Sequence, residues 1–132
     1  MRPDVRSAFD AFPDDVRHRL LAIRATIFQV AKTDPRIGAI TETLKWGEPA
    51  YLTMETGSGS TIRLGRSGPN RSRAALFFHC RTELVADFRA RFGGLFDYEG
   101  NRCVLLPAER EPEGGAVAYM LGMAMTYHLR RR

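Results

Sequence analysis

The chain has 132 residues, of which 44% are hydrophobic and 27% are charged, and its formal net charge is +5. This balance predicts one soluble globular domain. It excludes a disordered chain, and no apolar run approaches the roughly 20 residues that cross a bilayer. The first 15 residues carry acids where a secretory signal needs an apolar core, so we expect a cytoplasmic protein.

Two helices are predicted at the start of the chain. Residues 3–12 place apolar side chains three and four positions apart. Pro13 then opens a second amphipathic stretch, because its missing N–H costs nothing in a first helical turn. Thr33-Asp34-Pro35 ends that stretch.

Strand-like patterns follow. We predict a strand at 42–46 and a break at 47–49, where Pro49 removes a ladder donor. Apolar residues then alternate at 50–55 and again at 61–65. The Gly, Ser, Pro and Asn content of 65–73 predicts a loop.

The second half alternates strand and helix. Residues 74–80 are apolar on both faces, which predicts a central strand. Thr82 can cap a third helix that Gly93-Gly94 closes. Two strand-like runs then flank Gly100-Asn101, a pair suited to a tight two-residue turn, and a last helix is predicted at about 115–129.

Successive strands without long crossovers predict a mostly antiparallel sheet. The predicted fold class is therefore α+β, with one curved sheet packed on N-terminal and C-terminal helices. We expect a single domain that spans residues 1–132.

Three stretches together resemble one known family. They are ETLKWGEPAY, LFFHCRTELVADFRARFGGLFDYEGNRCVLLP and, in the last helix, MAMTYH. In this order, over about residues 37–128, they look like the YdhG-like proteins, domain of unknown function 1801. The resemblance implies a frataxin-like α+β sandwich but no agreed activity. Some relatives are discussed as iron chaperones by analogy with frataxin.

A candidate binding site begins at the only tryptophan of the chain. We predict six ligand-binding residues: Lys45, Trp46, Glu48, Tyr51, Arg63 and His79. Strand alternation would place Tyr51, Arg63 and His79 on one face with Thr53 and Phe77. Such a cationic, aromatic face suits a small anion, a nucleotide or a flat aromatic acid. A strand bend and a half-solvated sheet face without any ligand would show the same pattern.

Positive charge is concentrated in the middle of the chain. No Asp or Glu occurs from Thr56 to Thr82, and this stretch carries five arginines: Arg63, Arg66, Arg71, Arg73 and Arg81. The loop at 65–73 lacks the lysine and the spacing of a phosphate-binding P-loop. Stacking aromatics are not interleaved with the arginines, so we expect a solvated loop and do not expect nucleic-acid binding.

The remaining reactive residues predict no catalytic centre. Cys80 and Cys103 suggest two thiols on strands, with Cys80 in the core, rather than a disulfide scaffold or a zinc site. His128 lies on the apolar stripe of the last helix, which favours a core histidine. We predict no catalytic residue, metal site or cofactor.

We therefore expect a non-catalytic binding protein for a small anionic or aromatic ligand, monomeric or homodimeric and without a membrane partner. One alternative is a frataxin-like iron-binding chaperone that uses Asp10, Asp14 or Asp15, although neighbouring arginines oppose iron binding there. Another alternative is a basic interaction module for an acidic partner or nucleic acid, whose binding would depend steeply on salt.

Overall fold

The computed structural model describes residues 1–130. Its helices are α1 (Pro3–Asp10), α2 (Asp14–Thr33), α3 (Leu84–Phe92), α4 (Gly114–Met125) and α5 (Tyr127–Arg130), with 3-10 turns η1 (Pro69–Arg71) and η2 (Gly93–Leu95). Its strands are β1 (Thr41–Lys45), β2 (Glu48–Leu52), β3 (Ile62–Ser67), β4 (Arg73–Phe77), β5 (Asp97–Glu99) and β6 (Cys103–Leu105).

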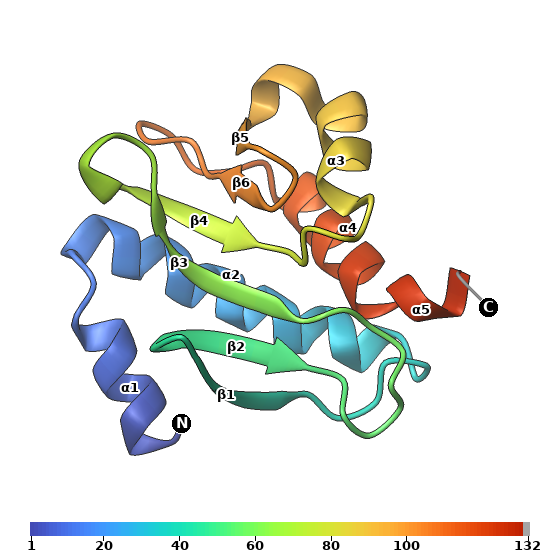
Figure 1. Cartoon of the computed structure of the whole chain (residues 1–132). Helices are drawn as coiled ribbons and strands as arrows, with labels where there is room; N and C mark the ends of the chain where they lie inside the picture. Colours follow the sequence, from blue (N-terminus) through green and yellow to red (C-terminus); the bar gives the residue numbers. More distant parts are fainter. Residues whose placement is uncertain (131–132) are drawn as a thin grey trace.

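The six strands form one sheet in the order β1-β2-β3-β4-β6-β5, and every neighbouring pair is antiparallel. Helices α2 and α4 run along one face of this sheet, and α1 packs beside the β1–β2 hairpin (Figure 1). The predicted α+β class, the antiparallel sheet and the central place of β4 are confirmed. Within residues 1–130, no helix is long and apolar enough to cross a membrane.

Helix α2 anchors the core because its apolar residues follow the helical period. Val16, Leu20, Ile23 and Ile27 are buried against the inward-facing side chains of the sheet. Burying each such side chain stabilises the fold by about 1.5–3 kcal/mol. The described helices all lie on this side of the sheet or at its edge, so the other face has no covering helix.

The strand break predicted at Gly47-Glu48-Pro49 is wrong. Lys45 pairs with Glu48, so Trp46 and Gly47 form a two-residue turn with φ values of 55° and 75°. Positive φ at both central positions is the type I′ pattern, whose twist matches the flanking strands. Pro49 is tolerated in β2 because the ladder to β3 begins only at the next residue.

Two predicted turns also differ from the structure. Strand β3 continues to Ser67, so the connection to β4 is shorter than the predicted loop at 65–73. The β5–β6 connection has three residues rather than two, because Glu99 pairs with Cys103. In both hairpins the last paired residues are set by the register of the two strands and not by the Gly, Pro or Asn residues of the turn.

The last helix ends earlier than predicted. Thr126 caps α4, its hydroxyl donating to the Gly122 carbonyl at 2.8 Å, and the chain restarts as the short helix α5. The backbone N–H of His128 then donates to Ser58 O at 2.9 Å. His128 is consequently exposed and is not the core histidine that the apolar stripe predicts.

Tyr51 lies on the helix-facing side of the sheet, which corrects its predicted place on the outer face. Its hydroxyl donates to Glu42 Oε2 at 2.7 Å, and its ring packs edge-on against Phe28. Arg24 donates to the other oxygen of Glu42 at 3.0 Å. The side chain faces the helices because Tyr51 pairs with the core residue Ile62, whereas Arg63 pairs with Ala50 on the opposite face.

Burial raises the pKa of Tyr51, and the Glu42 carboxylate adds to that shift. Burial also opposes ionisation of Glu42, but hydrogen bonds from Arg24 and Tyr51 outweigh it and hold the pKa of Glu42 below its ordinary value. The ionised carboxylate therefore stabilises the fold above its unfolded-state pKa of about 4.3. This stabilisation is lost as the pH falls through the lower folded-state pKa.

Replacing Glu42 should destabilise the protein, and the effect should depend on pH. We expect Glu42→Gln to lower the free energy of unfolding by about 1–3 kcal/mol at pH 7, because Arg24 loses its charged partner. Urea unfolding at pH 7 and pH 3 measures this, with Glu109→Gln on the exposed loop as the control. An equal effect of Glu42→Gln at both pH values would contradict the role of the ionised carboxylate.

Candidate functional site

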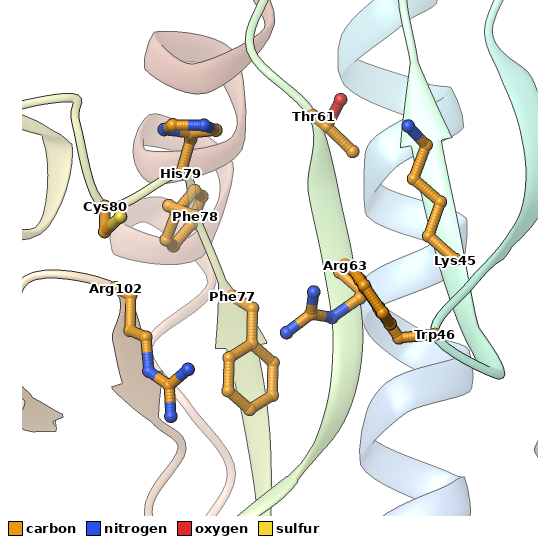
Figure 2. A pocket seen from close by; sticks show the side chains of 9 residues that line it. All are labelled: Lys45, Trp46, Thr61, Arg63, Phe77, Phe78, His79, Cys80 and Arg102. Carbon is orange, nitrogen blue, oxygen red and sulfur yellow. The ribbon is translucent and has the colours of Figure 1, made fainter.

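A cavity of about 310 Å³ lies on the sheet face that no helix covers. Figure 2 shows its walls, which come from the β1–β2 hairpin, β3, β4 with the loop after it, and the β5–β6 turn. The lining residues are Lys45, Trp46, Thr61, Arg63, Phe77, Phe78, His79, Cys80 and Arg102. They include three cations, a histidine and two accessible aromatic rings, and no acid.

The cavity brings together four of the six predicted site residues: Lys45, Trp46, Arg63 and His79. Glu48 does not line it but forms an ion pair with Arg63. Tyr51, the sixth, is excluded because it faces the helices. Arg102 was missed, because only the β4–β6 pairing brings its turn beside the end of β4, where Phe78 N donates to Arg102 O at 2.8 Å.

Arg63 is held in place from two sides. Its Nε lies 2.7 Å from Glu48 Oε1, and its guanidinium carbon lies 4.8 Å from the centroid of the Phe77 ring. The Nε–H lacks hydrogen-bond alignment with any residue in the described chain. In Figure 2 the guanidinium points across the cavity toward Phe77. A positioned planar cation of this kind is suited to a carboxylate or phosphate.

Glu48 reaches Arg63 by crossing the backbone of Gly65. A Cβ on Gly65 would collide with the Glu48 carboxylate and would lie 3.2 Å from Phe77 Cε2. The absence of a side chain at this position therefore makes room for the ion pair. Glycine is required here for space, because the backbone of Gly65 has ordinary strand geometry.

Gly65→Ala should displace Glu48 from Arg63. We expect the free energy of unfolding to fall by about 1–3 kcal/mol, since the added methyl overpacks a crowded face and breaks the ion pair. Gly94→Ala is the matched control, because a Cβ there meets no atom within 4 Å. Urea unfolding at pH 7 compares the two variants. Equal stability of both would show that the Glu48 side chain moves aside at no cost.

Trp46 occupies a position that stability does not favour. The side chain is 89% exposed, and its φ of 55° lies in the left-handed region that suits Gly, Asn or Asp. Such backbone strain costs about 1–3 kcal/mol and is concentrated at functional sites. The structure thus places an exposed indole in a strained turn beside a cationic cavity.

Trp46→Asn should stabilise the fold while it removes the indole wall of the cavity. We expect the free energy of unfolding to rise by about 0.5–1 kcal/mol, because Asn adopts this turn conformation more readily. Denaturant unfolding followed by circular dichroism measures the change. A loss of stability would instead show that the indole packs against the protein and that its exposure has no functional meaning.

Other cavity residues retain polar groups for a ligand. Neither Lys45 nor Arg102 has a side-chain ion pair among residues 1–130. His79 Nδ1 accepts a hydrogen bond from Arg81 N at 3.1 Å, which leaves Nε2 as the free ring nitrogen. Because β4 ends at Phe77, His79 lies in the loop beyond it rather than on the predicted strand.

The two cysteines lie in opposite environments. Cys80 follows β4 in an exposed loop and lines the cavity, which corrects its predicted place in the core. The cause is the early end of β4 at Phe77. Cys103 is buried in β6, where burial and the nearby Glu99 carboxylate raise its pKa to about 12. A thiol with that pKa stays protonated and unreactive at neutral pH.

The structure does not assemble the acids of the first two helices into a metal site. Within residues 1–130, no group of three or more His, Cys, Asp or Glu side chains could hold a metal ion. Asp14 pairs with Arg17, and Asp15 accepts a hydrogen bond from Val16 N at 2.9 Å. The described residues therefore offer no ligand cluster for the iron-chaperone alternative.

Comparisons with family models, with curated proteins and with solved structures gave no match to this chain.

Proposed function

We propose that the protein binds, without chemical conversion, a small ligand that combines an aromatic ring with an anionic group. The observation that supports this most directly is a single cavity that joins the exposed Trp46 ring to three cationic side chains and no acid. A cytoplasmic location and membership of the YdhG-like family remain predictions from the sequence and form part of the same proposal.

The polar and apolar parts of such a ligand have separate partners. Arg63 is already ordered by Glu48 and Phe77, so binding an anion there costs little further side-chain entropy. Lys45 and Arg102 approach from the two sides of the cavity, as Figure 2 shows. The indole of Trp46 offers a flat surface against which an aromatic ring can stack.

Binding rather than catalysis fits the polar contacts of the cavity. Within residues 1–130, the one hydrogen bond of the His79 ring is to a backbone amide, so that ring activates no nucleophile in the structure. Cys80 lines the same cavity, but in the described chain its thiol donates no hydrogen bond to a base. The groups present can therefore orient and neutralise an anion.

The single tryptophan makes the proposal measurable. We expect benzoate to change the Trp46 emission in a saturable way and benzamide, its neutral analogue, to bind at least tenfold more weakly. Lys45→Gln and Arg102→Gln should each weaken benzoate binding about 3- to 10-fold, the loss of one charge-assisted contact. Fluorescence titration at low ionic strength provides the dissociation constants.

The chain supplies a matched control, since it has only two lysines and the other, Lys32, is exposed near the end of α2. Lys32→Gln changes the net charge by the same amount and should leave benzoate binding unchanged. Equal effects of Lys32→Gln and Lys45→Gln would reduce the binding to general charge attraction. No saturable emission change with benzoate would reject the proposed function.

A further inference from the structure

A second cavity lies on the other side of Trp46. It has a volume of about 360 Å³ and is lined by Ala8, Ala11, Phe12, Trp46, Gly47, Glu48, Arg66 and Arg71. Trp46 is thus a wall shared by both cavities. The β1–β2 turn that carries Trp46 and the β3–β4 turn that carries Arg71 lie at the same end of the sheet (Figure 1).

The second cavity is also cationic. Across residues 1–130, neither Arg66 nor Arg71 forms a side-chain ion pair. Glu48 is the one acid in the lining, and its Oε1 lies 2.7 Å from Arg63 Nε, whose outer nitrogens face the first cavity. The exposed Trp46 indole therefore has Arg66 and Arg71 on one side and the cations of the first cavity on the other.

We propose that this surface binds single-stranded nucleic acid, with one base stacked on Trp46 and backbone phosphates on both sides of it. Lys45, Arg63 and Arg102 would bind phosphate in the first cavity, and Arg66 and Arg71 in the second. The inference rests on the proposed function, because the base and its phosphate are the aromatic anion of the first cavity. It adds the class of ligand and a second set of contacts.

Single-stranded nucleic acid accounts for the two cationic cavities beside Trp46 better than a small aromatic acid does. A single-ring anion occupies one cavity and makes no use of Arg66 and Arg71. Single-strand binders combine a cationic track along the backbone with aromatic rings that stack on bases. Stacking on an exposed ring such as Trp46 tolerates any base, because every base has an aromatic face. The net charge of +5 adds a general attraction for a polyanion such as nucleic acid.

The sequence does not predict nucleic-acid binding because it separates the aromatic residue from the arginines. Trp46 precedes Arg66 by 20 positions, so no stretch of sequence interleaves aromatic and basic residues. The antiparallel pairing of β2 with β3 places the β1–β2 and β3–β4 turns at the same end of the sheet.

The test compares hexathymidylate with thymidine monophosphate in titrations followed by Trp46 fluorescence. We expect the hexamer to bind at least tenfold more tightly than the mononucleotide. The logarithm of its affinity should fall with the logarithm of salt concentration with a slope of about −2 to −3, as expected for three or four neutralised phosphates. The Arg66→Gln/Arg71→Gln double variant should weaken hexamer binding tenfold or more and reduce the slope by about 1.4.

The matched control is Arg91→Gln/Arg110→Gln, which removes the same charge from exposed positions outside both cavities. Equal affinities for the hexamer and the mononucleotide, or equal effects of the two double variants, would overturn the inference. If benzoate still binds through Lys45 and Arg102 in that case, the proposed function stands alone. If benzoate also fails to bind, both are rejected.

Discussion

Helices cover only one face of the six-stranded sheet, and the other features of the molecule follow from this constraint. Inward-facing residues of β3, β4 and β6 join the core with α2 and α4, whereas Ala75, Cys103 and Leu105 are buried on the opposite face. That face must be shielded by the protein's own side chains. Ser67 on β3 is hydrogen-bonded to Glu99 on β5, although β4 and β6 lie between them. Strands lie about 4.8 Å apart, so the contact requires the sheet to curl toward this face.

The curled sheet, with side chains such as Ser67 and Glu99 that bridge its strands, forms a concave polar surface. Side-chain contacts cover one part of this surface, and another part is open. Arg73 and Asp97 close one part of it by an ion pair at 2.7 Å. Arg63, Glu48 and Phe77 order another part, next to the open cavity. Cations that are fixed by neighbours but not fully neutralised retain the capacity to bind an anion. The strained Trp46 turn borders this open part, and its indole is the surface on which the proposed ligand would stack.

The sequence predicts part of the candidate site, and individual residues show why it does not predict the rest. Lys45, Trp46, Arg63 and His79 were selected for residue type and strand phase, and the fold does place them around one cavity. Tyr51 lies on the helix-facing side instead, because the β2–β3 register pairs it with Ile62 and places Arg63 opposite Ala50. Arg66 and Arg71 belong to the basic stretch that the sequence shows, but it predicts them in a solvated loop, and Arg102 carries no local signal at all. Each reaches it only through pairing between distant segments.

The amino-acid sequence by itself determined the α+β class, the amphipathic α2 and the central β4, because these depend on local periodicity and on residue types that act over a few positions. Tertiary structure alone decided that Trp46 lies in a left-handed turn, that it separates two cationic cavities, and that the acids of α1 and α2 form no metal cluster. The physical reason is strand register. A shift of one residue exchanges the two faces of a strand, and register is set by the packing of the whole sheet against its helices.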